Sequence, residues 1–135
     1  MADGGLRQLI SKHISAAHWV AIESPLTSRG IPDLNGCLNG TEVWIETKAI
    51  EGWTVAISKE QVAWIERRSR ALGRVYVAVR RSRASGLWLL NPSAARPLLE
   101  GQRISSLPAD AIRLYSPGGP AAWDWYAIKS LIFQR

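Results

Sequence analysis

Cysteine is almost absent from this sequence, and its scarcity excludes two classes of protein. The chain has 135 residues and a single cysteine, Cys37. One cysteine cannot form a disulfide framework or a cysteine-based metal site. The composition therefore favours a reducing compartment, and we expect a cytoplasmic protein. A chain of this length buries roughly two-thirds of its unfolded surface, so it needs no such cross-link to fold.

Long apolar runs are missing as well. No stretch approaches the ~18 consecutive apolar residues of a membrane-spanning helix, and residues 1–14 lack the long apolar segment of a secretory signal. We therefore expect no membrane-spanning segment and no membrane partner. Repeats, low-complexity segments and linkers are also absent, which predicts a single domain over residues 1–135.

Acidic residues are absent from residues 67–83, and the basic charge of the chain is concentrated there. The sequence holds 17 Lys and Arg against 11 Asp and Glu, a net charge of +6, and seven of the arginines fall within this stretch. Arginine binds phosphate oxygens bidentately, and a clustered basic face on a small protein is typical of nucleic-acid binding. The alternative is a solvated surface that only increases solubility.

The spacing of apolar residues predicts elements in the order helix, strand, strand, strand, helix, strand. Apolar residues recur at three- and four-residue steps in the first helix, and Asn39-Gly40 is the strongest short signal for a hairpin. Ser58 and Gln61 form a capping box at the start of the second helix, and Gly73 ends it. The expected elements of this core lie at residues 5–17, 19–23, 31–38, 41–49, 59–72 and 74–81.

Beyond the core, which spans about residues 5–81, the sequence predicts an extension over residues 87–135. We expect a strand at residues 87–90, a short helix opened by Asn91-Pro92, and a closing helix at residues 120–133.

The turn at Asn39-Gly40 also fixes the register of the expected hairpin. Leu38 then faces Thr41, and counting back along both strands places Asp33 opposite Glu46. Opposed residues have Cβ atoms ~5 Å apart, so two carboxylates placed in this way repel each other. Pro32 leaves a second possibility open, because it has no N–H for the ladder. A bulge or a one-residue slip would send Asp33 to the other face.

Two opposed carboxylates with a lysine beside them predict chemistry on phosphodiester bonds. Mg²⁺ is commonly held by one or two carboxylates together with waters and phosphate oxygens, and Lys48 lies two residues beyond Glu46, on the same face. A cation there would polarise the phosphoryl group, while Lys48 would orient or deprotonate the attacking water and offset negative charge. Taken singly, Glu46 with Lys48 reads as a solvated ion pair, and Pro32-Asp33 reads as a turn.

These motifs resemble the PD-(D/E)XK nuclease superfamily. The resemblance lies in Ile31-Pro32-Asp33, followed after twelve residues by Glu46-Thr47-Lys48. The segments at residues 28–33, 58–65 and 79–81 resemble the VRR-Nuc branch and are similar to archaeal and phage Holliday-junction resolvases. The resemblance covers roughly residues 6–81 and implies an α/β, restriction-endonuclease-like core, with a mixed sheet flanked by helices.

The resemblance also implies roles for particular residues. Asp33 and Glu46 would bind Mg²⁺, or Mn²⁺ in its place, with the backbone carbonyl of Thr47 as a further ligand. Lys48 would be the catalytic lysine, and Gln61 would reach the site from its helix. Many relatives complete the site with a glutamate in the first helix, but residues 5–17 contain no acid. The candidates to replace it are Asp3, just before that helix, and Glu23, at the end of the next strand.

We therefore expect a Mg²⁺-dependent DNA endonuclease, selective for branched structures such as Holliday junctions. The alternatives are a restriction-like or nicking nuclease with the same core, and a non-catalytic basic module that binds nucleic acid. The expected DNA contacts are Ser28, Arg29, Arg67, Arg68 and Arg80.

A homodimer is expected, because resolving a four-way junction needs two symmetric cuts and the chain has one site. The closing helix is the candidate interface, since its apolar residues spread too widely for one face of a monomer to bury. These residues are Trp123, Trp125, Tyr126, Ile128, Leu131, Ile132 and Phe133.

Overall fold

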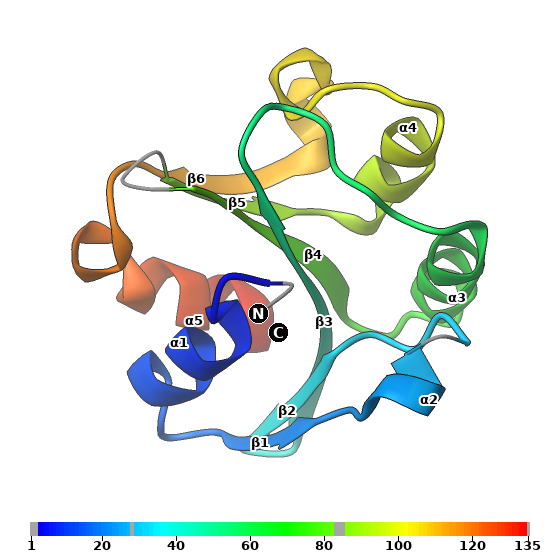
Figure 1. Ribbon diagram of the computed structural model, residues 1–135. Helices are drawn as coiled ribbons and strands as arrows, with labels where there is room; N and C mark the ends of the chain where they lie inside the picture. Colours follow the sequence, from blue (N-terminus) through cyan, green and yellow to red (C-terminus); the bar gives the residue numbers. More distant parts are fainter. Residues whose placement is uncertain (1–2, 28, 83–85, 135) are drawn as a thin grey trace.

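A six-stranded mixed sheet forms the centre of the computed structural model, which describes residues 3–27, 29–82 and 86–134 (Figure 1). The strands lie in chain order from β1 to β6; β3 and β4 are parallel, and every other neighbouring pair is antiparallel. Their bounds are β1 His18–Ala21, β2 Leu34–Leu38, β3 Thr41–Ile50, β4 Val75–Arg81, β5 Gly86–Leu90 and β6 Ile112–Ser116.

Helices cover both faces of this sheet (Figure 1). The α-helices are α1 Leu6–His13, α2 Ser24–Thr27, α3 Lys59–Arg70, α4 Ala95–Leu99 and α5 Trp125–Phe133. Short 3-10 turns lie at η1 Pro92–Ala94, η2 Ile104–Ser106, η3 Ala109–Ala111 and η4 Pro120–Ala122. Within the described residues, none of the helices has the length and apolar character needed to cross a membrane.

The alternation of side chains along the strands creates two hydrophobic cores, one on each face of the sheet. On one face, Leu34 and Ile45 pack with Leu6 of α1 and Ile132 of α5. On the other face, alternate residues of β4, such as Val77, pack with α3 and α4. A sheet with both faces covered needs apolar residues in both alternating sets, and β3 and β4 supply them at their centres.

The expected core order is confirmed, with α1, β1, β2, β3, α3 and β4 following one another as predicted. This is an α/β fold with a mixed sheet flanked by helices. The short helix α2 lies in the segment predicted as a loop. Helix α1 ends four residues earlier than predicted, and the carbonyl oxygen of Ile14 just after it accepts the Trp19 indole N–H at 2.8 Å.

The predicted extension differs more from the structure. Strand β6 was not predicted, and the closing helix begins at Trp125 rather than at residue 120. Asp124 explains the later start, because its side chain accepts the backbone N–H of Ala127 at 3.0 Å and caps α5. Proline 120 opens a separate 3-10 turn, η4, upstream of that cap.

Candidate active site

The hairpin between β2 and β3 has the register that Asn39-Gly40 predicts. Leu38 faces Thr41 and Leu34 faces Ile45, and both turn residues have positive φ angles, 51° at Asn39 and 80° at Gly40. Such angles are those of a tight two-residue hairpin turn.

The ladder ends at Leu34, so the predicted ladder pairing of Asp33 with Glu46 is wrong in detail. By the register, Thr47 would face Pro32, which has no N–H to donate. Beyond the end of the ladder, the Asp33 side chain provides the acceptor for Thr47, and its Oδ2 accepts the backbone N–H of Thr47 at 2.9 Å. Asp33 is thereby fixed at the edge of the hairpin, next to Glu46 rather than opposite it in a ladder.

Glu46 is buried in the middle of β3, with 2% of its surface exposed. Its Oε2 accepts from Gln61 Nε2 at 3.0 Å and lies 3.3 Å from Lys48 Nζ. Its Oε1 is buried and has no hydrogen-bond partner among the described residues. Burial, and then the charge of Asp33, raise the pKa of Glu46 to about 8, although Lys48 opposes this rise.

Gln61 links the start of α3 to the two site residues on β3. Its Oε1 accepts from Lys48 Nζ at 3.1 Å and from the backbone N–H of Ser58 at 3.0 Å. Its own backbone N–H donates to the Ser58 hydroxyl, which completes the predicted capping box. One side chain therefore does both things: Gln61 completes the helix cap and also contacts Lys48 and Glu46 in the site.

Thr47 connects Asp33 to a third acidic residue, Asp3. The hydroxyl oxygen of Thr47 lies 2.9 Å from Oδ2 of Asp33 and 2.9 Å from Oδ2 of Asp3. A hydroxyl has one proton, so it donates to one of these carboxylates at a time. Asp3 also accepts from the backbone N–H groups of Gly5 and Arg7 and from the Arg7 guanidinium.

Of the two acids considered for the missing glutamate, only Asp3 contacts a residue of the candidate site within the described part of the chain. Asp3 lies against the site and is 4% exposed, whereas Glu23 is exposed and lines a depression with Arg7. Burial by itself would raise the pKa of Asp3, but the hydrogen bonds from Thr47, Arg7 and Gly5 and the charge of Arg7 hold it below its usual value. The sequence feature that points to an ordered Asp3 is Arg7, four residues later, with the turn at Gly4-Gly5 between them.

The donor set fits a hard divalent cation. No three His, Cys, Asp or Glu side chains among the described residues are grouped so that they could hold a metal ion by themselves. Mg²⁺ does not require such a cage, because it keeps several waters and takes one or two carboxylates. The unpartnered Oε1 of Glu46, beside the carboxylate of Asp33, is the kind of buried acceptor that a cation would satisfy.

The arginines predicted to contact DNA do not form one surface, and Ser28 lies outside the described residues. Arg68 stacks over Trp64, 4.5 Å from the ring centroid. Arg80 lies on the α1 side of the sheet, where it donates to the Gly4 carbonyl at 2.7 Å. Arg29 and Arg67 are exposed and line the same depression beside α3.

No family model matches the chain, and no curated protein matches it. Among solved structures, the chain is similar to Hjc of Archaeoglobus fulgidus, a Holliday junction resolvase from an archaeal hyperthermophile. The TM-score is 0.46 and the sequence identity is 16%, with 74% of this chain and 88% of that chain covered. A similarity of this extent identifies neither the family nor the activity of the chain.

Proposed function

We propose that this chain is a Mg²⁺-dependent endonuclease that hydrolyses phosphodiester bonds in DNA. One observation carries the proposal: Glu46 is buried beside Asp33 with one oxygen unpartnered, while Lys48 and Gln61 hold its other oxygen. A structural ion pair would leave neither a buried orphan acceptor nor a second carboxylate next to it.

Asp33 and Glu46 would hold the cation through their carboxylates, and Thr47 through its backbone carbonyl. When bound, Mg²⁺ supplies charge stabilisation at the phosphoryl group and lowers the pKa of water. Lys48 is held in place by Gln61 and Glu46. From there its ammonium orients the attacking water and offsets the negative charge that develops on the phosphate. Thr47 keeps Asp33 in position through its N–H.

The finer proposal is that the enzyme prefers branched DNA and acts as a homodimer. It is supported by the resemblance of residues 28–33 and 46–48 to resolvases and by the need for two symmetric cuts in a four-way junction. We also propose, on the same resemblance, that this chain belongs to the VRR-Nuc branch. A restriction-like or nicking nuclease with the same core would use the same site residues.

A cleavage panel separates these functions. Linear, nicked and four-way DNA would be incubated with the protein in Mg²⁺, in Mn²⁺ and in EDTA. The proposal expects cleavage with either metal, none in EDTA, and paired symmetric cuts in the four-way substrate. Single nicks would favour the nicking enzyme. DNA binding with no cleavage of any substrate would identify a non-catalytic binding module.

The panel needs a variant that separates this site from a contaminating nuclease. Lys48→Ala removes the ammonium but leaves both carboxylates, so cleavage should be lost while DNA is still bound. Cleavage by this variant at the wild-type rate would show that the activity does not come from Lys48.

A further inference from the structure

The depression beside α3 is built by a close approach of the loop at residues 29–33 to the first turn of the helix. Gly30 has a φ of 90°, and a Cβ atom at that position would lie 2.2 Å from the carbonyl oxygen of Glu60. Only glycine permits this contact. The approach places Arg29 over the exposed side of α3, and Figure 1 shows α2 and this loop beside the helix.

The depression has a volume of about 240 Å³ and is lined by Arg29, Glu60, Ala63, Trp64 and Arg67. Neither Arg29 nor Arg67 makes a side-chain hydrogen bond or an ion pair with any residue that the structure describes. Glu60 is the only acid in the lining, so one guanidinium charge stays uncompensated. The other two arginines predicted to contact DNA, Arg68 and Arg80, already have partners.

Trp64 gives this depression a fixed wall. Its ring is half-buried, with the Arg68 guanidinium 4.5 Å from its centroid and Trp44 against it at 5.2 Å. These two neighbours pack against the indole and hold it at the side of the depression. A rigid apolar wall beside two guanidinium groups suits a sugar and its phosphate.

We propose that Arg29 and Arg67 bind a backbone phosphate of the DNA strand that is cleaved, a few nucleotides from the scissile bond. The inference rests on the proposed function, because Gln61 marks the catalytic end of the same helix. Six residues of α-helix separate Gln61 from Arg67, which is ~9 Å along the axis. One strand of duplex DNA advances ~3.4 Å per phosphate along the duplex axis, so a strand that runs alongside α3 would bring to Arg67 a phosphate roughly two or three nucleotides from the cut.

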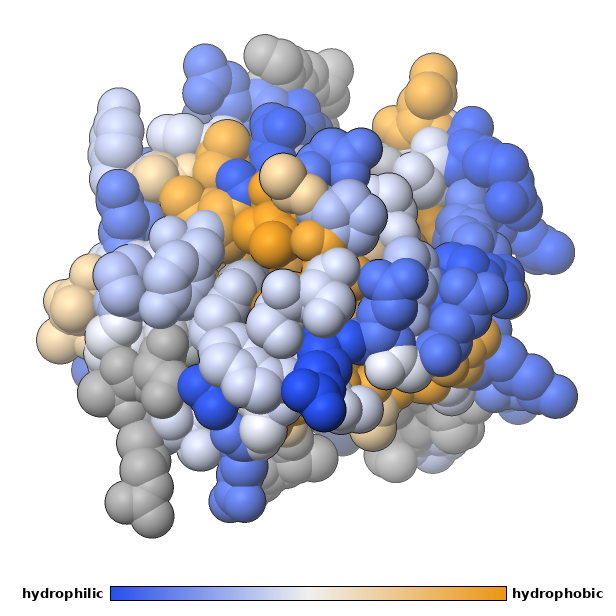
Figure 2. Space-filling view, turned by 90° about the horizontal axis from the view of Figure 1, so that it is seen from above, coloured by the Kyte–Doolittle hydropathy of each residue, from blue (hydrophilic) through white to orange (hydrophobic). Residues whose placement is uncertain are grey.

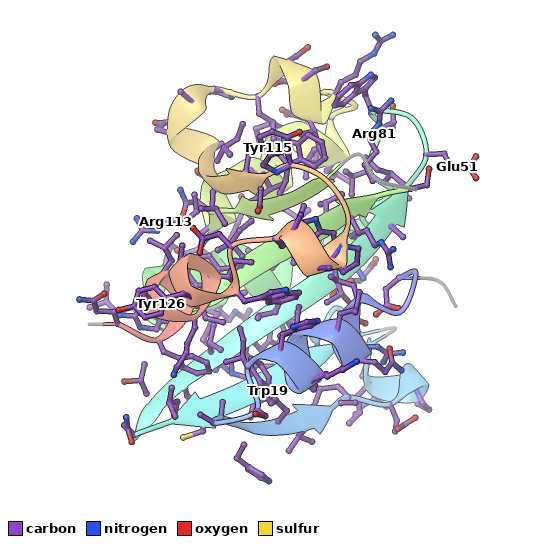
Figure 3. The ribbon with its side chains drawn as sticks, turned by 90° about the vertical axis from the view of Figure 1, so that its left-hand side faces the viewer. Trp19, Glu51, Arg81, Arg113, Tyr115 and Tyr126 are labelled. Carbon is purple, nitrogen blue, oxygen red and sulfur yellow. The ribbon has the colours of Figure 1, made fainter. Side chains whose placement is uncertain are left out.

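The first test measures DNA binding in EDTA, where cleavage cannot interfere. Arg29→Gln and Arg67→Gln should each flatten the slope of log affinity against log salt, and the double variant, which loses the whole contact with that phosphate, should reduce it by about 0.9. The matched control is Arg113→Gln, which removes another exposed charge from β6, on the side of the molecule drawn in Figure 3. Its slope should stay that of the wild type. Equal slope changes in all three variants, or none in any, would overturn the proposal.

The second test locates the phosphate. In the cleaved strand, neutral methylphosphonate linkages would replace the phosphates one at a time. The wild type should lose affinity at a position two or three nucleotides from the cut, and Arg67→Gln should lose less affinity there because one of the two phosphate contacts is already gone. A loss in Arg67→Gln as large as in the wild type would overturn the assignment. If cleavage fails but the salt slopes behave as expected, the depression still binds DNA and only the catalytic proposal is wrong.

Discussion

At the scale of single residues, Glu46 has the most unusual environment in the site. It is buried on β3, next to another carboxylate, and its pKa is raised to about 8. Without a cation it therefore keeps its proton at neutral pH. Mg²⁺ would have to displace that proton, because the ligand form of a carboxylate is the ionised one.

This raised pKa predicts how the stability of the metal-free protein depends on pH. The unfolded chain releases the Glu46 proton near its ordinary value of 4.5, and the folded chain near 8. The folded state thus binds more protons between these values, so stability should fall as pH rises from about 4.5 to about 8. The loss is at most a few kcal/mol. Urea unfolding in EDTA at pH 5 and pH 8 measures it.

Glu46→Gln is the control for this titration, since it keeps the shape of the side chain and has no proton to lose. Its stability should be nearly the same at both pH values, and Mg²⁺ should stabilise the wild type but not the variant at pH 8. A wild-type stability in EDTA that does not change between the two values would contradict the expected pKa.

The two carboxylates should also separate cleavage from binding. Asp33→Asn and Glu46→Gln each remove a metal ligand, so cleavage in Mg²⁺ should be abolished. Asp33→Asn also removes a negative charge that repels the phosphate backbone, whereas Glu46 already carries a proton in the metal-free protein. DNA affinity in EDTA should therefore be unchanged or higher for Asp33→Asn and unchanged for Glu46→Gln. Gel-based cleavage and anisotropy measure the two properties independently. Full cleavage by either variant in Mg²⁺ would be incompatible with the assignment.

At the scale of elements, α3 does more than cover the sheet. Its first turn holds Lys48 and Glu46 through Gln61, and its later turns carry Trp64 and Arg67. The capping box explains this arrangement, since the Ser58 cap fixes the residue at which the helix begins. A helix starting one residue later would turn Gln61 away from β3, because successive residues are ~100° apart around the axis.

The double role of Gln61 can be separated by two substitutions. Ser58→Ala removes a cap but leaves the contacts of Gln61 with β3, so it should cost about 1 kcal/mol of stability with cleavage nearly unchanged. Gln61→Ala removes the contacts with Lys48 and Glu46 as well, so cleavage should fall by ~10- to 100-fold. Thermal unfolding and single-turnover cleavage measure the two effects. Equal cleavage by both variants would show that Gln61 acts only in capping the helix and not in the site.

At the scale of the whole molecule, α5 belongs to the core of its own chain. Trp123, Ile128, Ile132 and Phe133 are buried against α1 and the sheet, and Trp125 stacks on His13 at 4.4 Å. Of the residues predicted for a dimer interface, Tyr126 is the one left largely exposed, at 83%, and Figure 3 shows it on the outside of α5. Because most of these apolar residues are buried within their own chain, the closing helix does not offer the apolar surface that the dimer prediction assumed.

The outer surface is also mixed in character. Figure 2 shows hydrophilic and weakly polar side chains over most of the face seen from above, with hydrophobic residues in a patch above its centre and in smaller areas toward its right-hand side. The Arg81 side chain lies in this upper part of the molecule, where it donates to the carbonyls of Glu51 and Gly52 and stacks on Trp53 at 3.7 Å (Figure 3). Like Arg68, it is a basic residue engaged with its own chain.

The homodimer prediction now rests on the chemistry of junction resolution alone. One chain carries one candidate site, and a four-way junction needs two symmetric cuts. Light scattering at micromolar concentration, with and without four-way DNA, should detect a mass of twice 14.9 kDa. A 14.9 kDa monomer that still makes paired cuts would contradict the prediction, and a monomer that only nicks would favour the nicking enzyme.

Much of the core is encoded by neighbouring residues and could be predicted from the sequence. Asn39-Gly40 needs no distant partner to form its turn, and the turn sets the register that brings Asp33 near Glu46. Ser58 and Gln61 define the start of α3 in the same local way. A continuous run of apolar residues at positions 75–79 then identifies β4, since a strand buried on both faces is apolar at consecutive positions.

Only the tertiary structure decided which distant groups meet. Asp3 reaches Thr47 across 44 positions of sequence. Arg68 and Arg80 contact their own chain, whereas the exposed Arg29 and Arg67 line the depression beside α3. Helix α5 packs with α1 in one hydrophobic core. The physical reason is that periodicity tells which face of an element is apolar or charged but not what covers that face. Local hydrogen bonds and turn geometry are fixed within a few residues, whereas burial depends on the packing of the whole chain.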